Sequence, residues 1–164
     1  MKRLTSDEII ELAAGTLQAE ADAITNLKGF VDGSFVRCVE LIYRSKGRVI
    51  VTGIGKSAII GEKLVASLNS TGTPAIFMHA ADAVHGDLGI VQPDDVIICI
   101  SNSGNTPEIK VLLPFIKISG NKLVAMVGNV DSYLARQADI VIKTSVEKEV
   151  CPNNLAPTSS TAAQ

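Results

Sequence analysis

Five short runs of hydrophobic residues divide the chain beyond residue 47. They are rich in Val and Ile, they do not alternate with polar residues, and they cover residues 48–53, 74–78, 95–101, 122–128 and 139–144. Continuous apolar runs of this length are typical of strands in a sheet that is covered on both faces. The pattern therefore predicts five buried strands.

Helical spacing of apolar residues marks the segments before and between these runs. The predicted helices cover residues 6–28, 34–45, 57–69, 106–119 and 131–137. Ser6 suits the N-cap of the first of them. Alternation of strands and helices predicts a three-layer α/β/α sandwich around a five-stranded parallel sheet with right-handed crossovers. With 164 residues we expect a single domain, in which residues 1–47 are an N-terminal helical part.

Composition and charge exclude several classes of partner. The net charge is −2, the aromatic residues are four Phe and two Tyr without Trp, and basic residues do not cluster. A nucleic-acid surface would need a clustered basic patch. No apolar run approaches the about 20 residues of a membrane helix. We therefore expect neither nucleic acid nor a membrane as a partner.

The cysteines indicate a reducing compartment. Cys38, Cys99 and Cys151 are widely spaced and odd in number, and no C-x-x-C pair is present. A zinc ribbon or a disulfide framework would need paired spacing. We expect reduced thiols in a cytoplasmic protein, which is consistent with a charged N-terminal segment that is not a signal peptide.

The stretch GIGKS, residues 53–57, follows the first predicted strand. A P-loop would need a glycine at position 50, which is Ile50. The dinucleotide fingerprint fits residues 53–58, but the acidic residue expected about 20 positions further on is missing. This absence weakens the dinucleotide interpretation. Two other interpretations are a tight turn with Ser57 as an N-cap, and a turn that presents Lys56 and the Ser57 hydroxyl to a small phosphorylated ligand.

The third predicted strand runs into ISNSGNTPE, residues 100–108. It carries the hydroxyls of Ser101, Ser103 and Thr106, with Gly104 among them, where a helix is predicted to begin. Hydroxyls and backbone N–H groups at a helix N-terminus bind anions, and ligands of parallel sheets bind at the carboxyl ends of strands. The sequence therefore predicts a phosphate site in this loop.

This S-x-S-G-x-T pattern after a buried strand resembles the phosphosugar-binding loop of sugar isomerase (SIS) domains. The resemblance extends through GIGKS, through residues 70–89 (STGTPAIFMHAADAVHGDLG) and through residues 148–161 (KEVCPNNLAPTSST). Together these motifs are similar to the arabinose 5-phosphate isomerase branch, in the form without CBS domains. The resemblance implies a flavodoxin-like fold and interconversion of D-ribulose 5-phosphate and D-arabinose 5-phosphate through an enediolate. It also implies a role in supplying Kdo for lipopolysaccharide biosynthesis.

The resemblance also assigns roles to single residues. The catalytic candidates are Lys56, Glu108, Glu149 and His85. The substrate-binding candidates are Ser57, Gly72, Thr73, Ser101, Asn102, Ser103, Thr106, Ser159 and Ser160. His79 matches a histidine that is associated with an inhibitory divalent metal in relatives.

Ketose–aldose interconversion moves a proton between two neighbouring carbons. It needs a base for the carbon-bound proton and an acid or a cation near the two oxygens, but no redox or metal cofactor. A glutamate suits the first role, and both Glu108 and Glu149 are candidates. Lys56 would stabilise the oxyanion charge or orient a glutamate, and His85 would shuttle protons between the oxygens.

Three further expectations concern the whole molecule. The last residues, APTSSTAAQ, are typical of an N-cap and a first helical turn, so we expect the natural chain to continue beyond Gln164. By resemblance the protein forms a homotetramer or a dimer, with the helix at residues 6–28 as a contact element. The alternative function is a non-catalytic sugar-phosphate sensor, since such a module needs only the phosphate loop.

Overall fold

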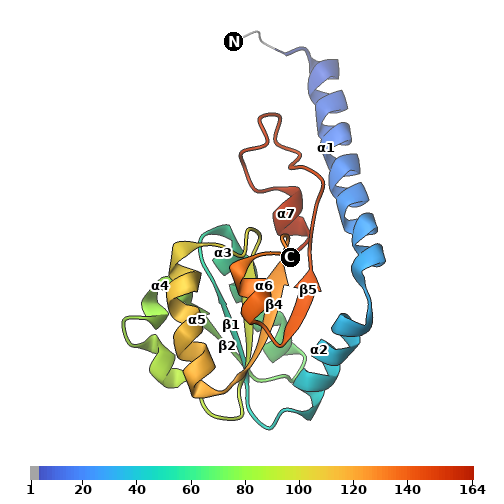
Figure 1. Ribbon diagram of the computed structural model, residues 1–164. Coiled ribbons are helices and arrows are strands. Elements are labelled where there is room, and N and C mark those ends of the chain that lie inside the picture. Colours follow the sequence, from blue (N-terminus) through green and yellow to red (C-terminus); the bar gives the residue numbers. More distant parts are fainter. Residues whose placement is uncertain (1–3) are drawn as a thin grey trace.

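Five parallel strands form one sheet at the centre of the computed structural model, which describes residues 4–164 (Figure 1). The order across the sheet is β2-β1-β3-β4-β5, and every neighbouring pair is parallel. The strands are β1 (Val49–Gly53), β2 (Ala75–His79), β3 (Val96–Ser101), β4 (Lys122–Val127) and β5 (Ile140–Lys143). The predicted sheet is confirmed, and each strand begins and ends within one residue of the predicted bounds.

Helices connect the strands and precede them. They are α1 (Ser6–Asn26), α2 (Gly33–Arg44), α3 (Lys56–Ser70), α4 (Ala80–Ala83), α5 (Pro107–Ser119), α6 (Tyr133–Gln137) and α7 (Ser159–Ala162). Two short 3₁₀ helices, η1 (Leu27–Phe30) and η2 (Asp87–Ile90), complete the described elements. The sequence pattern missed α4 and η2, because a single helical turn carries too few residues for a periodicity.

The start of α1 corrects one prediction. Thr5, not Ser6, is the N-cap: its Oγ1 accepts a hydrogen bond from Glu8 N at 3.3 Å, and Thr5 N donates to Glu8 Oε2 at 2.7 Å. This reciprocal pair is a capping box, which satisfies two backbone N–H groups at once. The helix also ends earlier than predicted, at Asn26, where the chain tightens into η1.

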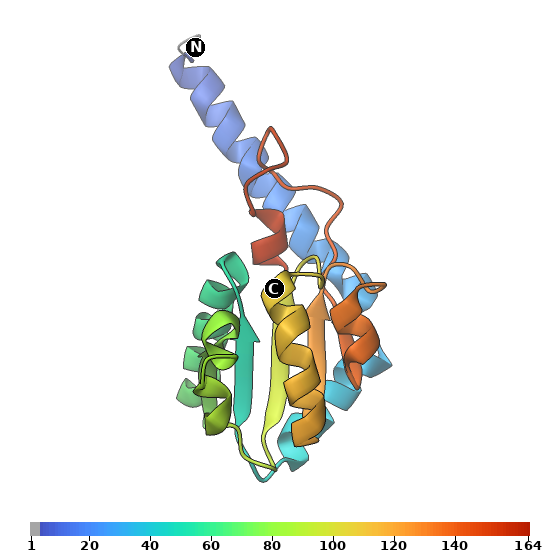
Figure 2. The ribbon, with the colours of Figure 1, turned by 60° about the vertical axis from the view of Figure 1, so that its left-hand side comes forward.

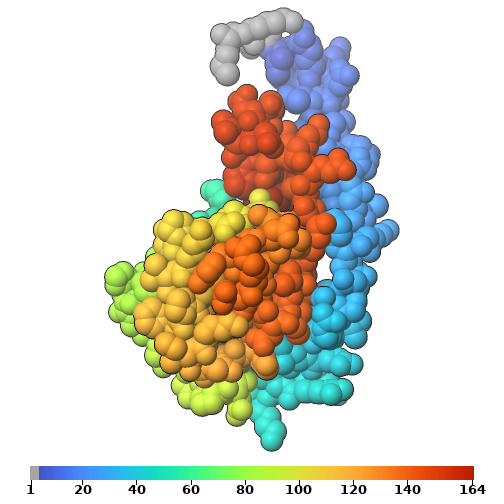
Figure 3. All heavy atoms as spheres, in the orientation of Figure 1, coloured from blue at the N-terminus to red at the C-terminus, as the bar shows by residue number. Residues whose placement is uncertain are grey.

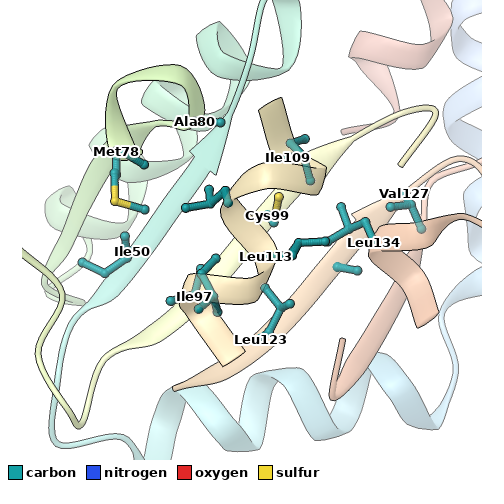
Figure 4. Close-up of a cluster of buried hydrophobic side chains, with 14 of the residues drawn as sticks. Ile50, Met78, Ala80, Ile97, Cys99, Ile109, Leu113, Leu123, Val127 and Leu134 are labelled. Atoms are coloured by element: carbon teal, nitrogen blue, oxygen red, sulfur yellow. The ribbon is translucent and has the colours of Figure 1, made fainter. Parts of the chain in front are cut away.

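The core consists of two layers, one on each face of the sheet (Figure 2). On one face, α4, α5 and α6 cover Ile50, Ile97 and Leu123, and Figure 4 shows Ile109 and Leu113 of α5 pointing toward them. On the other face, α2 and α3 cover Val51, Ile98 and neighbouring strand residues. Because both faces are buried, the strands need apolar residues at every position, which explains their unbroken hydrophobic runs.

A buried ion pair fastens the loops at the amino edge of the sheet. The Asp95 side chain is 1% exposed and accepts hydrogen bonds from Arg48 N, Arg48 Nη2 and Gln92 N at 2.7–2.8 Å. Burial alone would raise the pKa of Asp95, but the hydrogen bonds from Arg48 and Gln92 outweigh it and hold the pKa below its ordinary value. The carboxylate thus ties the starts of β1 and β3 together.

Helix α1 projects beyond the sheet, and the chain after β5 rises beside it (Figures 1 and 3). None of the residues of α1 is buried, and among the described elements α1 contacts α7 and the adjoining η1. Residues 1–3 of the predicted N-terminal helical part lie outside the described residues. Within residues 4–164, no helix has the length and apolar character needed to cross a membrane.

Candidate functional site

A cavity of about 350 Å³ lies at the carboxyl ends of β1 and β3, beneath the segment that follows β5. The β1–α3 turn contributes Ile54, Lys56 and Ser57, and the β3–α5 loop contributes Ile100, Ser101, Asn102, Ser103 and Thr106. The segment after β5 contributes Glu149, Asn154, Leu155, Pro157, Ser160, Thr161 and Gln164. Three chain segments that the sequence analysis singled out separately therefore line one cavity.

Hydrogen bonds within the hydroxyl-rich loop fix its conformation. Ser101 Oγ lies 3.2 Å from Thr106 Oγ1 and accepts from Gly104 N at 3.1 Å. Ser103 Oγ accepts from Asn105 N at 3.2 Å. Thr106 occupies the N-cap of α5, yet its side chain makes no capping hydrogen bond within the described chain. The first N–H groups of this 13-residue helix are thus available to an anion, and the Thr106 hydroxyl can bind one in addition to its hydrogen bond with Ser101.

Glycine makes this loop possible. Gly104 has φ +62°, and a Cβ placed there would collide with the Ser132 side chain. Only glycine adopts this backbone without strain at so close an approach. Gly55, with φ +61°, plays the corresponding part in the first turn, where it is the N-cap of α3. The interpretation of Ser57 as that N-cap is therefore wrong: Ser57 lies in the first turn of α3 and lines the cavity.

The Glu149 carboxylate faces the cavity and is held by a set of donors. Its Oε2 accepts hydrogen bonds from Thr158 N at 2.7 Å, Thr158 Oγ1 at 3.0 Å and Ser160 N at 3.1 Å. Partial burial alone would raise the pKa of Glu149, but the hydrogen bonds from Ser160 and Thr158 outweigh it and hold the pKa below its ordinary value. Glu149 is therefore ionised at neutral pH.

The two other predicted charged groups differ in their access to the cavity. Lys56 is exposed at the start of α3 and lines the cavity together with Glu149, so a cation and an anion face the same space. Glu108, in the first turn of α5, is half-buried and is not among the lining residues. Its Oε2 is buried and has no hydrogen-bond partner in the part of the chain that the structure describes.

Several predicted residues lie away from this cavity in the single chain. Gly72 and Thr73 precede β2, so they lie at the amino edge of the sheet, opposite the cavity. His85 is exposed in the connection after α4. Ser159 is buried and lines a second cavity of about 510 Å³ between α1 and the segment after β5. Their roles in binding or catalysis stay predictions.

His79 is placed at the end of β2, where its Nδ1 lies 3.7 Å from Asp82 Oδ2. Among residues 4–164, no group of three or more His, Cys, Asp and Glu side chains is arranged to hold a metal ion. Within the described residues, Asp82 is thus a single carboxylate neighbour of His79, and no three-ligand set forms around it.

Sequence reasoning missed two residues that shape the site. Asn154 has φ +52° and is the non-glycine residue with positive φ among those described; its Oδ1 accepts from Glu149 N at 2.9 Å. Thr158 holds the other end of Glu149 through its backbone and hydroxyl. The Asn-Asn pair in CPNN was a usable signal, because Asn tolerates the left-handed conformation of tight turns.

A family model described as the SIS domain matches residues 41–164. The chain belongs to the SIS-domain family. Two solved structures have the same fold with a TM-score of 0.94, and each match covers 98% of this chain and 85% of the other. They are Escherichia coli CFT073 c3406 in complex with arabinose 5-phosphate, 37% identical, and a putative sugar-phosphate isomerase from Listeria monocytogenes, 39% identical. The predicted family and fold class are confirmed.

Curated relatives of this SIS domain bear isomerase names. The arabinose 5-phosphate isomerase KdsD of Pseudomonas aeruginosa is 48% identical over 154 residues, which are 94% of this chain and 47% of the relative. The arabinose 5-phosphate isomerase KpsF of Escherichia coli is 48% identical over 147 residues, which are 89% of this chain and 45% of the relative. The chain thus spans about half the length of these curated relatives.

Proposed function

We propose that this SIS domain interconverts D-ribulose 5-phosphate and D-arabinose 5-phosphate. One observation carries the proposal: Lys56, Glu149 and the hydroxyl-rich loop of Ser101, Ser103 and Thr106 line the same cavity. Phosphate recognition alone would need only the loop, whereas a cation and a carboxylate beside it supply acid–base chemistry. The isomerase names of the relatives and the arabinose 5-phosphate bound to the similar E. coli protein support the same reaction.

The phosphate group binds at the β3–α5 loop. The N-terminus of α5 offers backbone N–H groups, and Ser103 and Thr106 offer hydroxyls that the capping of α5 does not use. Lys56 and Ser57 close the cavity from the β1–α3 turn, and Ser160 closes it from the segment after β5. Asn102, exposed beside them, contacts the same end of the ligand.

The reacting carbons lie toward Glu149 and Lys56. Glu149 removes the proton from one of the two carbons and returns it to the other, while the hydroxyl proton passes from one oxygen to the other, so the reaction has no net gain or loss of protons or electrons. The ammonium of Lys56 stabilises the negative charge that develops on the enediolate oxygens. Of the two candidate glutamates, Glu149 is favoured as the base because it lines the cavity and Glu108 does not.

Self-association is the second part of the proposal. Ile10, Ala14, Leu17, Ala21 and Ile24 follow a three–four spacing along α1, and all of them are exposed. This is the spacing of a coiled-coil seam, and its small alanines allow a partner helix to approach closely. We propose a homodimer or homotetramer in which α1 meets a second copy. His85, Gly72 and Thr73 take part in catalysis only where a neighbouring subunit brings them to the cavity.

The biological setting follows from the product. Arabinose 5-phosphate serves Kdo synthesis for lipopolysaccharide, as the resemblance implies, and the reaction belongs in the cytoplasm, where unpaired cysteines stay reduced. Cys38 and Cys99 are buried free thiols, and burial raises the pKa of Cys99 to about 12.

A coupled assay with D-ribulose 5-phosphate tests the enzyme against the sensor alternative. We expect turnover by the purified protein and its loss in Glu149→Gln, a change that keeps the shape of the side chain and removes the base. Glu147→Gln, in an exposed neighbour, is the matched control and keeps activity. Binding of the sugar phosphate without turnover by the wild-type protein would favour the sensor.

A further inference from the structure

We infer that Thr158 is a positioning residue for the Glu149 base: it fixes one carboxylate oxygen so that the other oxygen faces the reacting carbon. The inference deepens the proposed function and rests on it. Two observations support it: the Thr158 hydroxyl both donates and accepts a hydrogen bond, and three donors converge on Glu149 Oε2.

The Thr158 hydroxyl connects two parts of the same segment. It donates to Glu149 Oε2 at 3.0 Å and accepts from Val150 N at 2.8 Å, while Thr158 N donates to Oε2 at 2.7 Å. A serine or threonine hydroxyl can donate once and accept at the same time. The single hydroxyl proton is therefore committed to Glu149, and the hydrogen bond from Val150 N ties the orientation of the Thr158 side chain to the backbone next to Glu149.

The position of Thr158 in the chain supports a role beyond helix capping. Thr158 precedes the four-residue helix α7, and its side chain makes no capping hydrogen bond to that helix within the described residues. The hydroxyl that would normally serve the helix is directed to Glu149 instead. At the other side, Asn154 Oδ1 accepts from Glu149 N at 2.9 Å, so both the backbone and the carboxylate of Glu149 are fixed.

Because Oε2 accepts three hydrogen bonds, its lone pairs are committed to the protein. Proton transfer to and from carbon is then left to Oε1. A base held in one orientation reacts faster than one that rotates freely, because the cost of ordering it is met during folding rather than in the reaction.

Several other titratable groups lie near Glu149 or in the segments packed against it. Lys56 on α3 lines the same cavity as Glu149. Glu147, Lys148 and Cys151 flank it in its own segment, Asp22 of α1 lines the second cavity, and Glu8 and Glu11 of α1 line a further cavity with Val150. None of these groups is altered by changing Thr158, so a change in the titration of Glu149 would report the lost hydroxyl.

The test uses Thr158→Val, which removes the hydroxyl and keeps the volume of the side chain. If the valine variant does not fold, Thr158→Ala serves as a second variant without the hydroxyl. Thr158→Ser restores the hydroxyl. Thr16→Val is the matched control, because the Thr16 hydroxyl donates within α1, to Leu12 O. We expect kcat to fall about tenfold in the variants without the hydroxyl, and to return in Thr158→Ser. In the variants without the hydroxyl, the acidic limb of the pH profile of kcat/KM should move to higher pH.

A second readout is independent of turnover. The ¹³C carboxyl resonance of Glu149 can be assigned by its absence in Glu149→Gln. This resonance should titrate at higher pH in Thr158→Val than in the wild type, and Thr158→Ser and Thr16→Val should titrate as the wild type does. An unchanged titration in an active Thr158→Val protein would overturn the positioning role and leave the proposed function standing. Absence of turnover in wild type would overturn the proposed function and the catalytic role of Thr158 together, whatever the resonance shows.

Discussion

Lys56 shows how one glycine places a reactive side chain. Gly55 takes a backbone conformation that side chains disfavour, and α3 therefore begins directly at Lys56, above the carboxyl end of β1. The same lysine in a P-loop would face nucleotide phosphates, yet here Glu149 lines the same cavity. Opposite charges beside a hydroxyl-rich loop suit a small ligand that carries both a phosphate and reacting oxygens.

We expect Lys56→Ala to lower kcat about 100-fold while KM changes little, because the ammonium acts mainly on charge that develops in the transition state. Steady-state kinetics with D-ribulose 5-phosphate measure both constants. Lys63→Ala on the same helix is the control, since Lys63 is exposed and its ammonium donates to Ser67. An equal loss of kcat in both variants, or a rise in KM alone for Lys56→Ala, would contradict the role in catalysis.

At the scale of elements, the β3–α5 loop owes its shape to Gly104. We expect Gly104→Ala to weaken phosphosugar binding at least tenfold and to destabilise the fold by about 2 kcal/mol, because the new Cβ would meet Ser132 and the residue would keep a positive φ. Titration with D-arabinose 5-phosphate measures the change in binding, and thermal unfolding measures the change in stability.

Gly15→Ala gives the matched comparison for Gly104→Ala. Gly15 lies inside α1, and a Cβ added there would meet no neighbouring atom within 4 Å, so alanine should raise helix stability by about 1 kcal/mol. Equal effects of the two substitutions on binding would show that the loop does not need its left-handed glycine.

The elements differ in how far the sequence could predict them. The strands β1 and β3 were predictable because burial on both faces requires unbroken apolar runs, and the β3–α5 loop because its hydroxyls follow such a run. The path of the segment after β5 was not, since it depends on hydrogen bonds between residues up to eleven positions apart, such as Ser160 to Glu149. Gly72 and Thr73 precede the predicted strand at residues 74–78, so the predicted parallel sheet already placed them at its amino edge, away from the hydroxyl-rich loop.

At the scale of the molecule, the Asp95–Arg48 pair sets part of the stability against acid. The folded pKa of Asp95 is below its ordinary value of 3.8, so the pair contributes stability above that value and loses it as the pH falls through the folded pKa. We expect Asp95→Asn to be about 2 kcal/mol less stable than wild type at pH 7, because a charged partner of Arg48 is lost. Urea unfolding between pH 7 and pH 2 should show the difference shrinking below pH 4. A difference that stays constant over this range would exclude the pair as the cause.

The exposed apolar stripe of α1 is the surface through which we expect the protein to self-associate. Leu17 is 72% exposed at the middle of the stripe that we assign to a partner helix, while the other side of α1 lies along the chain after β5. A glutamate at this position would place a charge in a dry helix–helix contact, so Leu17→Glu should shift the homo-oligomer to smaller species at micromolar concentration in light scattering. Ile118→Glu, at an equally apolar and 84% exposed position on α5, is the control and should leave the assembly unchanged. Dissociation by Ile118→Glu alone would move the interface from α1 to α5, and a wild-type protein that is strictly monomeric would exclude self-association altogether.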